Sequence, residues 1–220
     1  MRSYSQYCPI SRASEVLGER WTMLIVRNML LGCTSFTAIA QGVPGMSRSL
    51  LSARLRALES AGIIESRAKS KGRGRAYQLT EAGHELWDVL RPMAAWGARW
   101  IERQPQHANP SFVLWAWVHV HLRKDRLPDH RTVVEFEFPD EPPAHRRFWV
   151  HIEPPHAELC NADPGFEVDL YVTARSEAFT RWHIGELSWS TALRRGSIRV
   201  DGPRKLARAF PTWNEGAQLA

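Results

Sequence analysis

Apolar positions in the first sixty residues recur three or four apart, the spacing at which side chains share one face of an α-helix. Short breaks that contain glycine or proline separate these runs. Pro9 suits the first position of a helix, Gly18 suits the position after one, and Thr34 or Ser35 suits an N-cap. The pattern predicts three helices, over residues 9–18, 20–32 and 34–43.

The fourth predicted helix, residues 47–62, divides most clearly into an apolar and a polar face. Ser47 is a suitable N-cap, and Gly62 is a suitable stop. Leucines at positions 51, 55 and 58 form one stripe. The other face carries short polar and basic side chains: Arg48, Ser49, Ser52 and Arg56. Such a helix is expected to pack its leucines on its own domain and to leave the polar face free.

Two β-prone runs, residues 63–70 and 75–80, follow this helix and flank the basic hexapeptide SKGRGR, residues 70–75. Two such runs joined by a turn that contains glycine predict a β-hairpin with a basic tip. A long helix rich in tryptophan is predicted next, over residues 80–104. Pro92 is expected to break or kink it, because proline removes a backbone donor.

The pattern changes after the proline-containing stretch at residues 104–111, where we place a domain boundary. A helix is expected from residue 111 to about residue 123. Apolar residues then alternate with charged ones, which predicts an antiparallel sheet with one solvated face. The strand-like runs are residues 131–139, 146–154, 156–163 and 166–174, and the remaining segment reads as helix, helix, short strand and helix.

The net positive charge of the chain comes from its first half. The whole chain carries 29 Lys and Arg against 23 Asp and Glu, a net charge of +6. Residues 1–104 hold 15 basic and 8 acidic residues, whereas residues 105–220 hold 14 and 15. From Gly45 to Arg75 the counts are eight and two. A basic excess concentrated in this way predicts a polyanionic partner.

Three helices, a break, a helix with an arginine-serine face and a basic hairpin are typical of a winged helix-turn-helix. The fourth helix would enter the major groove of double-stranded DNA, and the hairpin would reach phosphates. A solvated surface helix is the alternative for the fourth helix taken alone. The expected DNA contacts are Ser47, Arg48, Ser49, Ser52, Arg54 and Arg56 from the helix, and Lys71, Arg73 and Arg75 from the wing.

Residues 7–104 resemble the HxlR-type winged helix-turn-helix regulators, a MarR-like bacterial family. The resemblance is carried by Cys8-Pro9, Gly18, Trp21, the LLG at residues 30–32, Phe36, the pattern S-x-x-L-L-S-x-R-L-R-x-L-E-x-x-G, and Y-x-L-T-E-x-G from Tyr77. It implies a homodimer formed through the terminal helices, and repression or activation at a pseudo-palindromic site. It also supports a sensor role for Cys8, because some members of the family sense oxidants or electrophiles through a cysteine at this place. A small buried apolar cysteine is the alternative for Cys8.

Residues 111–213 are similar to sterol-carrier-like lipid-binding domains, most clearly from residue 166 onward in F-T-R-W-H-I-G-E-L and G-S-I-R-V-D-G. The resemblance implies a five-stranded sheet and an apolar cavity for a small hydrophobic ligand. The aromatic residues could instead simply fill the core. The expected ligand contacts are Phe112, Trp115, Phe136, Phe138, Phe148, Trp182, Leu187 and Trp189.

The predicted fold class is therefore α+β. Residues 1–104 form a mostly helical winged helix-turn-helix domain with a β-hairpin wing, and residues 105–220 form an α/β sandwich-like domain with about five mainly antiparallel strands. A lipid-transfer or enzymatic second domain, and a winged helix that binds protein rather than DNA, are the alternative functions.

No catalytic, cofactor or metal motif stands out, so we expect a protein that is not an enzyme and has no cofactor. G-x-S-x-G, P-loop and H-E-x-x-H patterns are lacking, and neither His119 with His121 nor Glu153 with His156 and Cys160 has a distinctive ligand spacing. The three cysteines form no C-x-x-C pair. Without a signal peptide or a long apolar run, the protein is expected to be cytoplasmic and not membrane-bound.

Overall fold

The structure, a computed structural model, describes residues 3–68 and 74–216. Its internal contacts divide the chain into two compact units, Met1–Ile101 and Glu102–Ala220, and each is described by itself. The division falls three residues before the boundary expected from the sequence. Within the described residues, no helix is long and apolar enough to cross a membrane.

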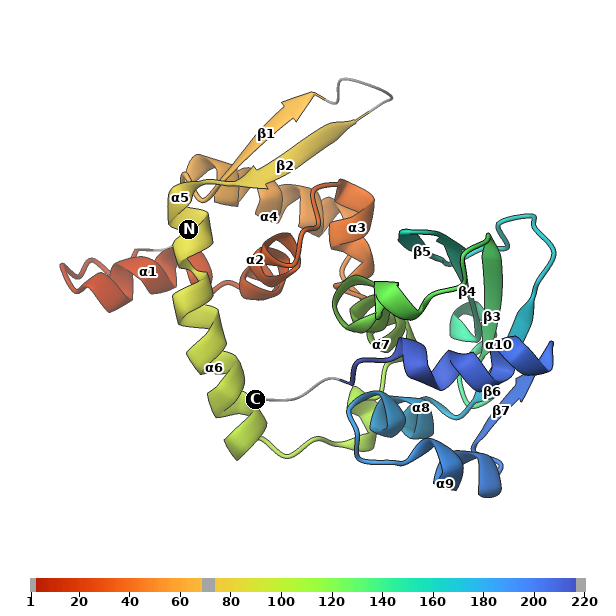
Figure 1. The fold of residues 1–220 in the computed structure, drawn as a ribbon. Helices are drawn as coiled ribbons and strands as arrows, with labels where there is room; N and C mark the ends of the chain where they lie inside the picture. Colours follow the sequence, from red (N-terminus) through yellow and green to blue (C-terminus); the bar gives the residue numbers. More distant parts are fainter. Residues whose placement is uncertain (1–2, 69–73, 217–220) are drawn as a thin grey trace. The chain divides into compact units, whose positions relative to one another are not determined.

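The first unit has the order of elements that its hydrophobic pattern predicts, with a two-stranded antiparallel hairpin after the fourth helix (Figure 1). Each predicted helix start is within two residues of the observed one. The elements are α1 (Pro9–Leu17), α2 (Thr22–Leu30), α3 (Phe36–Gln41), α4 (Arg48–Ser60), β1 (Ile64–Ala68), β2 (Arg75–Leu79), α5 (Glu81–Glu85) and α6 (Trp87–Trp100).

A buried polar contact joins α2 to α3 inside the first unit. Asn28 is fully buried, and its Nδ2 donates to the carbonyl oxygen of Ile39 at 3.0 Å. The Arg27 guanidinium donates to Asn28 Oδ1 at 2.7 Å and to the carbonyl oxygen of Gly42 at 2.8 Å. Burial lowers the pKa of Arg27 to about 10. These bonds satisfy buried groups that would otherwise be costly, and they fix α3 on α2.

Thr80 and Gly83, which follow β2, fasten the base of the hairpin to the residues just after α4. Thr80 Oγ1 donates to the carbonyl oxygens of Gly62 and Ile63, at 2.7 and 3.0 Å, and accepts from the backbone N–H of Gly83 at 3.2 Å. A Cβ atom at Gly83 would lie 2.3 Å from the carbonyl oxygen of Ile63. Glycine is therefore required at position 83 because another backbone segment approaches it so closely.

Pro92 lies inside α6 and does not break it; of the break or kink expected there, the break is not present. The long helical segment is interrupted instead at Leu86, between α5 and α6. Proline removes the hydrogen bond to the carbonyl group four residues earlier, that of Asp88. Asp88 is exposed, so water can satisfy this carbonyl group and the helix continues.

The second unit is a five-stranded mixed sheet in the order β5-β4-β3-β6-β7, with several short helices. The β3–β6 pair is parallel and the other three pairs are antiparallel, so the sheet is not purely antiparallel. The strands are β3 (Thr132–Glu137), β4 (Arg147–Glu153), β5 (His156–Cys160), β6 (Leu170–Ala174) and β7 (Ile198–Asp201). The longer helices are α7 (Pro110–Ala116), α8 (Ser176–His183), α9 (Trp189–Arg194) and α10 (Arg204–Ala209). Helix α7 continues as a π-helix, η2 (Trp117–His121), and α10 is followed by a short 3-10 helix, η5 (Phe210–Trp213).

Aromatic rings fill the space between the sheet and the helices of the second unit. The Phe136 ring lies 5.7 Å from Trp117, 5.6 Å from Phe179 and 6.1 Å from Phe210, measured between centroids. All four side chains are fully buried. Edge-on and tilted ring pairs of this kind add to the stabilisation from burial. The core of this unit is thus a connected aromatic cluster.

Candidate nucleic-acid interface

The α3–α4 pair forms a helix-turn-helix whose two helix starts are both capped by serine. Ser35 Oγ accepts from the backbone N–H of Ala38 at 3.2 Å, and Ser47 Oγ accepts from that of Leu50 at 3.3 Å. Gly45, in the turn, has φ +86°, a conformation that glycine adopts without strain. The sequence predicted Ser47 as the N-cap of α4, and this is confirmed.

The leucine stripe of α4 is buried to 2% exposure or less, at Leu51, Leu55 and Leu58. Because an α-helix repeats every 3.6 residues, this burial turns Ser49 and Arg56 outward. Both are exposed, as is Arg48 at the first turn, while Ser52 is half-buried. The division of the helix into two faces that the sequence predicted is therefore present.

Arg48 and Arg56 are held differently on this outward face. The guanidinium of Arg48 lies over the ring of Phe36 on α3, with Cζ 4.8 Å from the ring centroid. A cation–π contact of this kind limits the directions in which the arginine extends. Arg56 makes no salt bridge within the described part of the chain and is free to extend from the middle of the helix.

Arg54, also expected at the DNA, lies elsewhere. Its side chain is 22% exposed and forms an ion pair with Glu19 at 2.6 Å. Arg54 follows Leu51 by three residues and precedes Leu58 by four, so it flanks the buried stripe. The structure does not bring it together with Arg56 and Ser49. No local pattern in the sequence indicates this partner, because Glu19 precedes Arg54 by 35 residues.

Arg75, at the start of β2, ties the hairpin to α4. It donates to Ser66 Oγ at 2.8 Å and lies 3.5 Å from Glu59 at the end of α4, and Ser66 also donates to Glu59. The side chain remains 57% exposed. The other two expected wing contacts, Lys71 and Arg73, lie outside the described residues.

A stripe of exposed apolar side chains runs along α6. The exposed fractions are 49% for Val89, 48% for Met93, 58% for Trp96 and 62% for Trp100. These positions are spaced by four, three and four residues, so they share one face of the helix. We call them the α6 stripe. Exposed apolar surface of this kind is common at the interaction surfaces of proteins.

Most of the side chains expected to contact a ligand lie inside the aromatic core of the second unit. Trp115, Phe136, Phe138, Phe148 and Trp182 are buried, and the Phe138 ring lies 5.7 Å from that of Phe179. Phe112 and Trp189 are half-buried, and Leu187 borders a charged hollow that contains Arg181. The structure therefore places most of these rings against one another.

The three cysteines have different surroundings. Cys8 is half-buried at the N-terminus of α1, where the backbone N–H groups of Ser11 and Ile10 lower its thiol pKa. Its sulfur completes no capping hydrogen bond, so we attribute this effect to the electrostatics of the helix start. Cys33 is buried, and desolvation raises the pKa of Cys160. Within the described residues, no cluster of His, Cys, Asp and Glu could hold a metal ion.

Comparison with known proteins identifies the first unit. Residues 16–105 match the family described as HxlR-like helix-turn-helix. An uncharacterised HTH-type transcriptional regulator of Bacillus subtilis, YvaP, is 33% identical over 100 residues, which are 44% of this chain and 93% of YvaP. The chain belongs to the HxlR-like helix-turn-helix family. The resemblance seen in residues 7–104 of the sequence is thereby confirmed.

Other relatives match about the same share of the chain. An uncharacterised HTH-type transcriptional regulator of Mycobacterium tuberculosis is 37% identical over 95 residues, and the match spans 43% of this chain and 60% of that relative. The reduced form of the transcriptional regulator YodB from B. subtilis has 31% sequence identity and a TM-score of 0.39, and covers 44% of this chain and 97% of that chain.

The lowered thiol pKa makes Cys8 the cysteine that should react first with an alkylating agent. Thiolate is the reactive form, and a lowered pKa leaves more thiolate at neutral pH. We expect iodoacetamide at pH 7 to modify Cys8 several-fold faster than Cys160 in the folded full-length chain. The Cys8 rate should also reach half its maximum at a lower pH. Time-resolved peptide mass mapping measures both rates, and equal or faster labelling of Cys160 would contradict the assignment.

Proposed function

We propose that this protein is a transcriptional regulator that binds double-stranded DNA through α4, as the HxlR-like family implies. The observation that supports this most strongly is the division of α4 into two faces. Its leucines are buried in the first unit, and its basic and hydroxyl side chains extend outward from a capped helix-turn-helix. A helix presented in this way fits the major groove.

The outward residues suit distinct kinds of contact in the groove. Arginine forms bidentate hydrogen bonds to the O6 and N7 atoms of guanine, which makes Arg56 the best candidate for reading a base. Ser49 and Ser52 can bond either bases or phosphates. For Arg48, at the first turn and held over Phe36, we propose a contact with the flanking DNA backbone. We propose that Arg54 serves the fold rather than the DNA, because it is paired with Glu19.

The hairpin is proposed to supply phosphate contacts that add affinity without reading sequence. From Gly45 to Arg75 the chain carries eight basic and two acidic residues. Arg75 keeps more than half of its side chain exposed while it is bonded to Ser66 and lies beside Glu59. This attachment would hold the direction of the wing relative to α4.

We also propose a homodimer formed through α6 and α1. The α6 stripe is uncovered within the first unit, and Ile10 in α1 and Tyr7 just before it are 76% and 97% exposed. Burial of such surface is the main force that associates protein chains. A two-fold dimer would place two α4 helices at successive turns of the DNA, about 34 Å apart, and would select a pseudo-palindromic site.

The signal that controls the regulator is a separate proposal. Oxidation of Cys8 is favoured by the lowered pKa of its half-buried thiol. Control by a hydrophobic ligand in the aromatic core remains a prediction of the sterol-carrier resemblance, and such a ligand would have to displace packed rings. A lipid-transfer or enzymatic role for the second unit also remains a prediction.

Replacing Arg56 tests the base-reading role. Duplexes selected from genomic fragments by the full-length protein should bind Arg56→Ala about 5- to 150-fold more weakly, the equivalent of about 1–3 kcal/mol for one lost base contact. Binding to random duplex should fall less, because phosphate contacts persist. Fluorescence anisotropy at matched salt measures both affinities. Arg126→Ala, the same charge change on the second unit, serves as the control.

An equal loss on selected and random duplexes would contradict base reading by Arg56. If the wild-type chain binds no duplex even at low salt, the proposal of DNA binding fails. The winged helix would then be better explained as a protein-binding adaptor.

Replacing Trp96 tests the dimer. The wild-type chain should sediment at twice the monomer mass of 25.2 kDa. Trp96→Glu should shift it toward 25.2 kDa, because a charge buried in an apolar interface without a partner is strongly unfavourable. Tyr171→Glu places the same charge at a half-exposed aromatic residue of β6 and should leave the mass unchanged. Sedimentation equilibrium that finds Trp96→Glu still dimeric would rule out the α6 stripe as the interface.

A further inference from the structure

Charge is segregated within the second unit. Residues 189–213, which span α9, β7 and α10, carry six basic residues and one acidic residue, Asp201. The rest of residues 105–220 carries eight basic and 14 acidic residues. The basic residues of this segment are Arg194, Arg195, Arg199, Arg204, Lys205 and Arg208. Residues 189–213 therefore have a net charge of +5, whereas the rest of residues 105–220 has a net charge of −6.

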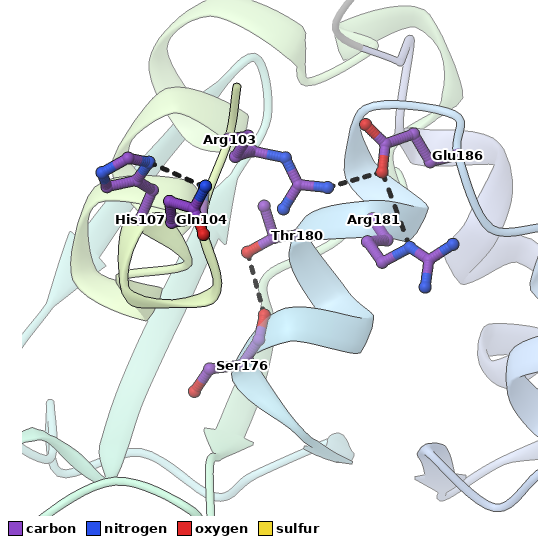
Figure 2. Close-up of polar contacts among 7 residues, drawn as sticks. All are labelled: Arg103, Gln104, His107, Ser176, Thr180, Arg181 and Glu186. Atoms are coloured by element: carbon purple, nitrogen blue, oxygen red, sulfur yellow. Dashed lines mark hydrogen bonds and ion pairs between the residues drawn. The ribbon is translucent and has the colours of Figure 1, made fainter. Parts of the chain in front are cut away.

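Several cations elsewhere in the second unit are neutralised by nearby carboxylates. Figure 2 shows Arg103 and Arg181 both bound to Glu186, and Arg147 lies 3.7 Å from both Glu135 and Glu137. In the described part of the chain, no salt bridge reaches any of the six cations of residues 189–213. Cations without a carboxylate partner favour a negatively charged ligand.

A hollow of about 470 Å³ is bordered by two of these six cations. Its floor is apolar, and two arginines of α10, Arg204 and Arg208, border it. They are four residues apart, so they extend from the same face of the helix. We call it the α10 groove. The apolar lining residues are Trp189, Leu193, Val200, Ala207 and Pro211.

We propose that the α10 groove binds a small organic anion with an apolar body and one carboxylate or sulfonate group. The apolar body would cover Leu193, which is 43% exposed, and the half-buried Val200. The acidic group would accept hydrogen bonds from Arg204 and Arg208, whose planar guanidinium groups match a carboxylate. The volume is within the range of pockets for small ligands, about 300–1,000 Å³.

The groove differs from the ligand site expected from the sequence. That site was placed among the rings of the aromatic core, whereas the groove lies on the surface and includes only Trp189 of the expected contacts. Its apolar floor favours an amphipathic small molecule over nucleic acid, because a phosphate backbone would leave Leu193 and Val200 uncovered by apolar contacts. Binding in this groove does not depend on whether the first unit binds DNA.

Two probes with the same ring system test the proposal on the full-length chain. One is 8-anilinonaphthalene-1-sulfonate, and the other is N-phenyl-1-naphthylamine, which lacks the sulfonate. Arg204→Gln with Arg208→Gln should weaken binding of the sulfonate probe at least about tenfold, because each charge-assisted hydrogen bond to the sulfonate contributes substantially to its affinity. The affinity for the uncharged probe should change by less than about twofold. Leu193→Gln should weaken both probes, because both use the apolar floor.

Arg194→Gln with Lys205→Gln is the matched control, because it removes the same charge from residues that do not line the groove. It should change the affinity for the sulfonate probe by less than about twofold. Hydrogen exchange with the sulfonate probe bound should slow in peptides that cover residues 189–213. Unchanged thermal unfolding of each variant shows that it is folded.

Three results would overturn the proposal. If the two double substitutions weaken binding of the sulfonate probe equally, its affinity depends only on the net charge of the protein. Exchange protection confined to α6 would place the probe on the exposed stripe of the first unit. A loss of duplex affinity in Arg204→Gln with Arg208→Gln, with no change for the sulfonate probe, would make the patch a nucleic-acid surface instead.

Discussion

The burial of the leucine stripe of α4 determines what the first unit can present to a partner. Leu51, Leu55 and Leu58 are each at 2% exposure or less, and together their burial stabilises the unit by several kcal/mol, about 1.5–3 kcal/mol for each side chain. A rotation of α4 that moved Arg56 inward would expose these leucines and bury a charge. The direction of the polar face is therefore a consequence of core packing and does not require DNA to be present.

Contacts around α4 extend this constraint to the rest of the unit. Asn28 and Arg27 fix α3 on α2, and Ser47 caps α4 after the turn. Thr80 bonds the end of the hairpin to the loop after α4. Glu59 and Ser66 hold Arg75, where β2 begins after the turn of the hairpin. These contacts position the two strands of the hairpin, while α6 leaves its apolar stripe exposed within the first unit.

Features that depend on local sequence could be predicted, and features that depend on distant partners could not. The helix bounds, the Ser47 cap and the outward Arg56 follow from periodicity and capping chemistry within a few residues. The pairing of Arg54 with Glu19 depends on tertiary packing, as does the parallel β3–β6 pair. Pro92 does not break α6, because the exposed carbonyl group of Asp88 tolerates a missing donor. The size of the aromatic residues could not show whether they line a cavity or fill one.

Methylation protection on a selected duplex tests the central claim most directly, because dimethyl sulfate modifies guanine N7, an atom of the major groove. If α4 enters the groove from a two-fold dimer, binding should protect guanine N7 atoms in two segments whose centres are about one helical turn apart. Tight binding that leaves every guanine N7 in the selected site as reactive as in free DNA would contradict the account.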